Sequence, residues 1–369
     1  MLVDQGKISL EDDIRKYLPE MPDYGTPITI ANLVYHTSGI RSTDDLQFAG
    51  FGPQDITTLP ICLNFAFAQK QLLFNPGARY NYSNTNYNLL VEIVSRVTGT
   101  PFSEWCKENI FRPYGMNNTW FKTDIGQVAE HGVHCYSGTK DGFVELQNNW
   151  AATGASGLQT SIDDLEKWLI GIESRQHMND RIYKLLNTTT TLKDGSPNKY
   201  VFGNEVVKND NKNEVAHLGL VLGFRTAILR YPDQKLSIVY LSNDGNDATY
   251  QRAWKIRDIF LGTNTENLPD LNKMPTVEGA LKQIENAKKY RETVDVNPYV
   301  GTYFSEELST VWTLKNEDGQ LVIHHPRIHP IKLKSSSKDQ FSFLQFVRDD
   351  SDDVIGLKIL GGGIVFDKK

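Results

Sequence analysis

The sequence predicts an α+β fold, in which helices flank an antiparallel sheet and a small antiparallel β-barrel follows at the C-terminus. Strand-like runs at 214–218, 224–230 and 236–242 follow one another and then give way to a helical pattern at 247–261. Strands in succession followed by a helix are typical of an antiparallel sheet that helices cover. From residue 298 the chain is a series of short strand-like runs, which predicts the separate β domain.

The opening residues have the pattern of a helix that is ending. Leu2 and Val3 are apolar, and Gly6 lies where a glycine C-cap would stand. No Ser, Thr, Asp or Asn that could cap the start of a helix precedes them. We therefore expect this stretch to complete a helix rather than to begin one.

Two amphipathic helices are predicted before the sheet. The first has an apolar stripe with helical spacing, at Leu90, Ile93, Val94 and Val97. Gly99 lies where this helix would end. The second helix starts at Ser161, which together with Asp164 resembles a capping box. Its buried stripe is predicted at Leu165, Trp168, Leu169 and Ile172.

Turn residues set the domain boundaries. Pro232-Asp233 joins the second and third strands, and Gly262 ends the helix at 247–261, so the first domain is placed at 1–262. Residues 263–297 are interpreted as a linker that contains a charged helix at 277–290. About seven short strands, separated by Asn, Asp, Gly and Ser clusters, assign 298–369 to the β domain.

Composition restricts the functional class. A hydrophobic content of 39% and an aromatic content of 11% supply a core. The net charge of −6 and the absence of a basic stripe argue against a nucleic-acid partner. No apolar run approaches the roughly 18 residues of a transmembrane segment. The cysteines, Cys62, Cys106 and Cys135, have no metal-like spacing and are interpreted as free thiols.

The stretch FNPGARYNYSNTNYNLL, at 74–90, carries the most functional information. It places Tyr82 and Asn84 between the Pro76-Gly77 turn and a predicted helix, where a rigid element meets a loop. The block resembles the second motif of the serine β-lactamase and penicillin-binding-protein superfamily, in its class C and DD-peptidase branch. Similar family landmarks follow in order at LVYHTSGI (33–40), IFRPYGMNNT (110–119) and TGASGLQTSIDDLEKWL (153–169). His217-Leu218-Gly219 resembles the third motif, which is Lys-Thr-Gly in β-lactamases.

The first motif of the superfamily, Ser-x-x-Lys at the start of a helix, is not found where the resemblance requires it. The resemblance implies that it lies shortly before Met1, so we expect the chain to be N-terminally truncated and inactive as given. Three Ser-x-x-Lys strings do occur, beginning at Ser137, Ser196 and Ser335, but all lie in polar, turn-rich sequence. No G-x-S-x-G motif is present either, because Gly154-Ala155-Ser156-Gly157 is followed by leucine.

The resemblance implies a role for each remaining site residue. Tyr82 would be the phenol that works with the absent lysine, and Asn84 would bind the substrate carbonyl and that lysine. His217 would donate to a substrate carboxylate, the role we favour, or to Tyr82. Gly219 would let the substrate backbone approach the strand, and the N–H of Leu220 would be an oxyanion donor. No cofactor is expected.

Other histidines are interpreted as structural. His36 and Ser38 share a tight turn, a placement in which a nucleophile and its base rarely pair. The pairs at His131/His134 and His324/His325 lack the recurring Cys or carboxylate partners of a metal site.

The His-x-Gly motif and the extra β domain, which resembles a lipocalin-like domain, favour a substrate that is an ester or a D-amino-acid peptide. Two alternatives stay open: a non-catalytic ligand-binding protein, and a true β-lactamase when full length. The expected partner is a small-molecule or peptide substrate. The resemblance also implies a periplasmic or extracytoplasmic location for the full-length protein.

Overall fold

The computed structural model describes residues 1–52, 55–209, 212–262, 294–360 and 363–369. The chain forms two compact units. The first consists of Met1–Ser42, Ile56–Phe67 and Phe74–Leu268, and the second of Thr43–Asp55, Ala68–Leu73 and Pro269–Lys369. The charged helix predicted at 277–290 lies outside the described residues. The predicted boundaries at 262 and 298 stay predictions, and the second unit also takes in two short segments from the first 73 residues.

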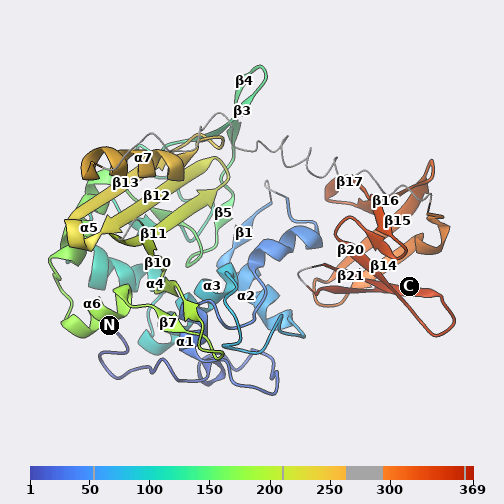
Figure 1. Cartoon of the computed structure of the whole chain (residues 1–369), viewed down its shortest axis with the longest axis horizontal. Helices are drawn as coiled ribbons and strands as arrows, with labels where there is room; N and C mark the ends of the chain where they lie inside the picture. Colours follow the sequence, from blue (N-terminus) through green and yellow to red (C-terminus); the bar gives the residue numbers. More distant parts are fainter. Residues whose placement is uncertain (53–54, 210–211, 263–293, 361–362) are drawn as a thin grey trace. The chain divides into compact units, whose positions relative to one another are not determined.

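A five-stranded antiparallel sheet, in the order β13-β12-β11-β10-β9, forms one layer of the first unit (Figure 1). Its strands are β9 (Tyr200–Val201), β10 (Asn204–Asn209), β11 (Lys212–Val221), β12 (Phe224–Tyr231) and β13 (Leu236–Ser242). The three predicted strands are confirmed as β11, β12 and β13. The turn after β12 is a short helical turn, Pro232–Gln234. Smaller two-stranded pairings join β1 (Thr57–Thr58) to β5 (Trp150–Ala151), β2 (Trp120–Phe121) to β6 (Leu158–Gln159), β3 (Cys135–Thr139) to β4 (Gly142–Leu146), and β7 (Thr190–Thr191) to β8 (Pro197–Asn198).

Helix α7 (Thr249–Leu261) packs on β12 and β13 and ends, as predicted, at Gly262. Beneath it the side chain of Glu214, on β11, is fully buried. Its carboxylate accepts hydrogen bonds from Tyr231, from Tyr250 at 3.0 Å and from Trp254 at 3.3 Å. Because a buried carboxylate needs such donors, this network fixes β11 relative to α7.

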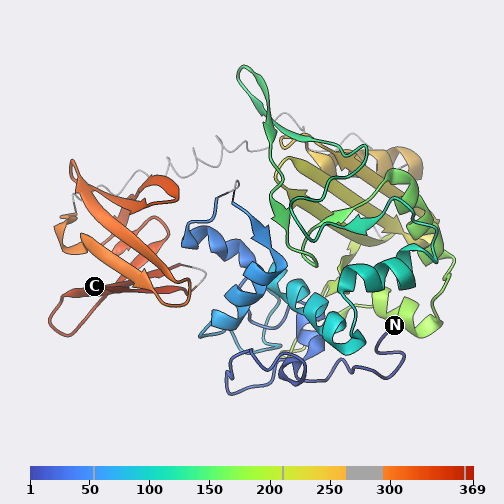
Figure 2. The same ribbon diagram turned by 180° about the vertical axis from the view of Figure 1, so that it is seen from behind.

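The helical part of the first unit contains α1 (Ile30–Val34), α2 (Leu59–Ala68), α3 (Asn84–Thr98), α4 (Phe102–Cys106), α5 (Ile162–Glu173) and α6 (Asp180–Asn187) (Figure 2). Helix α3 ends at Gly99, as predicted, in the left-handed conformation. Of its predicted apolar stripe, Ile93 is buried and Leu90, Val94 and Val97 are partly buried. The helix also buries Thr85, Asn86, Asn88, Leu89 and Val91. It is enclosed on more than one face, between α1 and the backbone of 152–154.

Helix α5 begins at Ser161, whose side chain caps the N–H of Asp164. In a full capping box the Asp164 carboxylate would also accept from the backbone N–H of Ser161. Here this carboxylate makes a tertiary contact instead. The Asp164 carboxylate accepts from the N–H of Asn118 at 2.7 Å and from Thr119 at 2.9 Å. The predicted buried stripe is confirmed, with Trp168 partly buried. Among the described helices, none is long and apolar enough to cross a membrane.

The second unit is a curled, half-barrel antiparallel sheet of nine strands in the order β17-β16-β15-β14-β22-β21-β20-β19-β18. The strands are β14 (Gly301–Ser305), β15 (Thr310–Glu317), β16 (Gln320–His325), β17 (Ile328–Lys332), β18 (Ser335–Ser337), β19 (Gln340–Phe341), β20 (Leu344–Arg348), β21 (Val354–Ile359) and β22 (Val365–Lys368). The predicted antiparallel β domain is confirmed, but two details differ. The run at 340–347 is divided into β19 and β20, and the serine-rich β18 was not predicted.

Residues 43–52 and Asp55 belong to this second unit and pack on its strands. The indole of Trp312 donates to the carbonyl of Phe48 at 3.0 Å, and Arg327 pairs with Asp55 at 2.7 Å. Gly50 has φ +83°, and a Cβ there would lie 2.1 Å from the ring of His325. Only glycine fits this approach without moving the histidine.

Candidate active site

The turn after α1 supports the loop that carries Tyr82. His36 is fully buried and has φ 54°, in the left-handed region. Its Nδ1 accepts from the N–H of Ser83 at 3.2 Å and lies 3.0 Å from Nδ2 of Asn86. Its carbonyl accepts from the N–H of Asn81 at 2.9 Å. The backbone on both sides of Tyr82 is therefore tied to one buried histidine.

A second buried contact joins the same turn to α3. The hydroxyl of Ser38 donates to Oδ1 of Asn86 at 2.7 Å and accepts from the N–H of Ile40. Both His36 and Ser38 are thus engaged in holding the turn against α3, which agrees with the structural role predicted for them. Asn84 is the first residue of α3, and its N–H donates to the hydroxyl of Ser42 at 3.1 Å.

Tyr82 and His217 come from different elements and meet. The Tyr82 side chain is 41% exposed, and its ring centroid lies 4.3 Å from that of His36 and 6.3 Å from that of His217. His217 lies on β11, and Gly219 and Leu220 follow it on the same strand. The structure therefore brings Tyr82, just before α3, to the strand that carries His217, Gly219 and Leu220.

The strand β11 has an open edge where these residues lie. Its pairing with β10 covers Lys212 to Ala216, whereas its pairing with β12 continues to Val221. Among the described strands, β12 is thus the only neighbour of the stretch from His217 to Val221. A Cβ on Gly219 would lie 2.2 Å from Oγ1 of Thr226, and Leu220 is 71% exposed. An extended ligand can approach such an edge through backbone hydrogen bonds.

Tyr200, on β9, is a site residue that the sequence did not predict. Its hydroxyl lies 3.0 Å from Nε2 of His217, and the side chain is almost fully buried. Its ring centroid lies 4.4 Å from that of His36 and 5.9 Å from that of Tyr82. The sequence around it, Tyr-Val-Phe before Gly203, indicates only a short strand, so no local signal points to this role.

Burial keeps both site histidines neutral near pH 7. It lowers the pKa of His36 to about 3, with a smaller contribution from His217. Burial also lowers the pKa of His217, against the opposing effects of a backbone hydrogen bond at Leu218 and of the Glu205 carboxylate. Burial raises the pKa of Tyr200 well above its usual range, and neighbouring tyrosines add to this effect. The Tyr200 hydroxyl therefore keeps its proton.

Comparison with known families identifies the fold. The family described as Beta-lactamase matches residues 1–261. The chain belongs to this family. That confirms the superfamily resemblance drawn from the Tyr82 and His217 motifs, and the match ends at the last residue of α7.

Several proteins that are similar in sequence are D-aminopeptidases. The chain is 30% identical to the D-aminopeptidase of Gluconobacter oxydans over 174 residues, which are 47% of this chain and 33% of the relative. It is 27% identical to that of Brucella ovis over 255 residues, which are 69% of this chain and 48% of the relative. The chain thus spans between a third and about half of the length of these relatives.

Solved structures share the fold. The octameric penicillin-binding protein homologue from Pyrococcus abyssi matches all of this chain and 83% of its own, with a TM-score of 0.64 and 21% identity. The D-stereospecific amidohydrolase from Streptomyces sp. matches 71% of this chain and 82% of its own, with a TM-score of 0.61 and 25% identity.

In this beta-lactamase family member the three Ser-x-x-Lys strings, predicted to lie in turn-rich loops, lie on or beside strands, and none of the three starts a helix. Ser137 is on β3, Ser196 precedes β8, and Ser335 is on β18. A strand or hairpin turn separates the serine and lysine side chains, whereas one helical turn would place them on the same face.

The histidine pairs that resemble metal ligands are engaged with single carboxylates or hydroxyls. His134 lies 2.6 Å from Glu145, His324 lies 2.7 Å from Glu317, and His325 lies 3.1 Å from Thr310. In the part of the chain that the structure describes, no group of three or more His, Cys, Asp or Glu could hold a metal ion. The three cysteines are buried free thiols.

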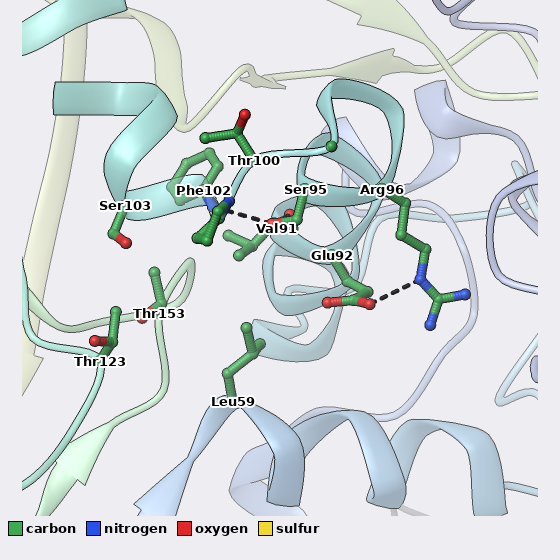
Figure 3. A pocket seen from close by; sticks show the side chains of 12 residues that line it. Leu59, Val91, Glu92, Ser95, Arg96, Thr100, Phe102, Ser103, Thr123 and Thr153 are labelled. Atoms are coloured by element: carbon green, nitrogen blue, oxygen red, sulfur yellow. Dashed lines mark hydrogen bonds and ion pairs between the residues drawn. The ribbon is translucent and has the colours of Figure 1, made fainter. Parts of the chain in front are cut away.

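A pocket of about 460 Å³ lies farther along α3 and is separate from this site (Figure 3). Val91 and Ser95 of α3 line it, together with Leu59 of α2 and Phe102 of α4. Val91 is seven residues beyond Asn84, which corresponds to about 10 Å along a helix. None of the five predicted site residues lines this pocket.

Proposed function

We propose that the protein is a serine hydrolase that acts by acyl transfer on esters, amides or peptides of D-amino acids. The observation that carries the proposal is the meeting of Tyr82, just before α3, with His217 on β11, at 6.3 Å between ring centroids. The D-aminopeptidase relatives support the stereochemical class. The Streptomyces amidohydrolase, at 25% identity, supports it as well.

Each residue has a chemical task in this proposal. As the phenolate, which a neighbouring lysine ammonium stabilises, Tyr82 takes the proton of the attacking serine and then passes it to the leaving group. The Asn84 carboxamide binds the substrate carbonyl. The N–H of Leu220 stabilises the developing oxyanion, and Gly219 keeps the strand clear of side-chain atoms so that the substrate can approach.

The proposal needs a serine nucleophile that starts a helix. Because the three Ser-x-x-Lys strings of these 369 residues lie in hairpins, we assign the nucleophile and its lysine to a segment outside these residues. The alternative is a protein that binds such substrates without cleaving them. The placement of the three Ser-x-x-Lys strings in hairpins agrees with this alternative as well.

The buried state of His217 bears on the substrate. A cationic imidazole would suit a free carboxylate, which is the role the sequence favoured for this residue. Burial lowers the pKa of His217, so little of the cation is present near pH 7. We therefore place a neutral acyl group, rather than a free C-terminal carboxylate, beside His217.

The test compares the 369-residue chain with the protein expressed from its complete reading frame. Both are treated with fluorescent penicillin and a fluorophosphonate, and hydrolysis of D-alanine and L-alanine p-nitroanilide is measured. We expect labelling and D-selective turnover from the complete reading frame alone, with the label on a serine of a helical Ser-x-x-Lys.

Label on Ser137, Ser196 or Ser335 would contradict the assignment of the nucleophile. Binding of D-amino-acid amides without labelling or turnover by either protein would leave the non-catalytic alternative. Turnover of penicillin faster than of the p-nitroanilides would indicate a β-lactamase.

A further inference from the structure

We propose that Ser42 is a positioning residue, whose hydroxyl oxygen holds the backbone of Asn84 at the first position of α3 and thereby orients the Asn84 carboxamide. For its catalytic meaning this inference rests on the proposed function, because only that function gives the carboxamide a task. Its structural basis is a hydrogen bond between two residues of the first unit, which can be tested without any activity.

The direction of this hydrogen bond is fixed by its donor. The backbone N–H of Asn84 can only donate, so the hydroxyl oxygen of Ser42, 3.1 Å away, is the acceptor. Asn84 is the first residue of α3, and the N–H groups in the first turn of a helix have no partner within the helix. Ser42 therefore supplies, from 42 positions earlier in the chain, a partner that the helix itself cannot supply.

The residue that would ordinarily cap α3 does not do so. Ser83 is at the N-cap position, where a serine side chain usually accepts from an N–H of the first turn, but its side chain makes no capping hydrogen bond. Its Oγ is buried and has no hydrogen-bond partner in the part of the chain that the structure describes. The start of α3 thus depends on the hydroxyl of Ser42 rather than on the side chain next to it in sequence.

The chain that leads to Ser42 is itself held in place. The two residues directly before it, Ile40 and Arg41, are each only 1% exposed. The N–H of Ile40 donates to the hydroxyl of Ser38, which in turn donates to Asn86 of α3 at 2.7 Å. The turn that ends at Ser42 is therefore fastened to α3 at a second point, which keeps the Ser42 hydroxyl within reach of the first N–H of the helix.

The consequence concerns the carboxamide of Asn84. The position of a backbone fixes the point from which its side chain extends, and a catalytic group loses efficiency when it is displaced by about 1 Å. Without the Ser42 hydroxyl, the first residue of α3 would lose the bond that holds its N–H. Ser42 carries no charge, so it acts on the reaction through the placement of Asn84.

Amide hydrogen exchange tests the contact in the 369-residue chain. Labelling with ¹⁵N-asparagine places the amides of Asn81, Asn84 and Asn86 in one spectrum, where each signal is assigned by its loss in an Asn→Asp variant. Ser42→Ala should accelerate exchange of the Asn84 amide about five- to tenfold, which corresponds to one hydrogen bond. The amides of Asn81 and Asn86 donate to backbone carbonyls and serve as internal controls, so their rates should stay within about twofold.

Three outcomes of this measurement would overturn the proposal. One is an Asn84 amide that exchanges at the rate of an unstructured peptide in the wild type, a result that does not depend on any variant. Another is an unchanged Asn84 rate in Ser42→Ala. The third is equal acceleration of all three amides, because this would mean that the substitution loosens the whole region. Ser42→Thr keeps the hydroxyl and should exchange like the wild type.

Activity tests whether Ser42 acts through Asn84. In the protein from the complete reading frame, Ser42→Ala should lower kcat/KM for D-alanine p-nitroanilide about tenfold, and Ser42→Thr should retain it within about twofold. In an Asn84→Ala background, Ser42→Ala should cause no further loss, because the carboxamide that it positions is gone. The same tenfold loss in both backgrounds would contradict the positioning role.

The two measurements separate this inference from the proposed function. A wild-type protein without turnover contradicts the proposed function, whereas the contact between Ser42 and Asn84 is still decided by the exchange rates. Normal kcat/KM in Ser42→Ala, in a wild type that is active, contradicts only the positioning role of Ser42.

Discussion

The two halves of the candidate site are held by different kinds of interaction. In the helical half, buried side chains bond to groups far away in sequence: His36 accepts from the backbone N–H of Ser83, and Ser38 donates to the side chain of Asn86. In the sheet half, His217 and Gly219 lie on a strand that is held by its backbone pairing with β12. A side-chain change should therefore break the helical half more readily than the sheet half, which is sensitive chiefly to added volume.

Buried polar atoms that lack a hydrogen-bond partner are a second feature of the helical half. Within the described residues, several of them lie at or beside α3, namely His36 Nε2, Ser83 Oγ, Thr85 Oγ1, Asn88 Oδ1 and Thr153 Oγ1. Each such atom costs about 1–3 kcal/mol of stability. The helical half is therefore already less stable, so removal of one of its remaining contacts should disrupt it more readily.

The largest effect is expected at the contact between α3 and the 152–154 backbone. Gly154 has φ +105°, and a Cβ there would lie 2.5 Å from the carbonyl oxygen of Tyr87. Gly154→Ala should lower the free energy of unfolding by about 3 kcal/mol or more, measured by urea titration. The control is Gly99→Ala, which has φ +67° but nothing within 4 Å of the added Cβ and should cost about 1 kcal/mol. Equal losses would mean that backbone conformation, not the close approach, sets the cost.

The next prediction compares one hydroxyl from each half. Ser38→Ala leaves Oδ1 of the buried Asn86 without its donor and should cost about 1–3 kcal/mol. Thr226→Val, on β12 opposite Gly219, should cost less than about 1 kcal/mol, because the backbone pairing remains. If denaturant titration gave the larger loss for Thr226→Val, the proposed difference between the halves would be wrong.

Added volume should damage the sheet half. A Cβ on Gly219 meets Oγ1 of Thr226 at 2.2 Å, so Gly219→Ala should cost about 1–2 kcal/mol. Thr226→Ala removes that oxygen and should restore most of the loss in the double variant. The coupling is read from a double-mutant cycle of unfolding free energies. Additive effects of the two substitutions would show that the contact is not the cause.

Acid should destabilise the helical half through His36. Its pKa is about 3 in the folded protein and near 6.5 when unfolded, so between these values the unfolded chain binds more protons. Stability conferred by neutral His36 is therefore lost as pH falls from 6.5 toward 3, by at most about 1.4 kcal/mol per pH unit. His36→Asn keeps an acceptor for Ser83 and tolerates the left-handed backbone, and it should flatten the unfolding free energy against pH in this window.

The control for this titration is His131→Asn, because His131 is 92% exposed and also has a positive φ. Its profile should match the wild type. A His36→Asn profile with the wild-type slope would assign the acid sensitivity to other groups.

The sequence predicted elements whose signals are local. Strand β13 matched its predicted bounds, and α3 ended at Gly99, because alternation and a glycine cap are written in neighbouring residues. The burial of α3 was not predicted, since the polar Asn86 and Asn88 are buried by partners 48 to 65 positions away. Tyr200 was missed for the same reason: its role depends on β9 lying beside β10 and on a hydroxyl that reaches His217 on β11. The motif at Tyr82 was found because family resemblance supplied the tertiary information that local patterns lack.

The most direct test of the central claim, that Tyr82 and His217 belong to one acyl-transfer site, is kcat and KM for D-alanine p-nitroanilide in Tyr82→Phe and Tyr80→Phe. Both are made in the protein from the complete reading frame. The two tyrosines are two residues apart, similarly exposed at 41% and 38%, and lose the same atom. We expect Tyr82→Phe to lower kcat by about 100- to 10,000-fold with KM nearly unchanged, and Tyr80→Phe to retain kcat within a few fold. Wild-type kcat in Tyr82→Phe, or equal losses in the two variants, would contradict the account.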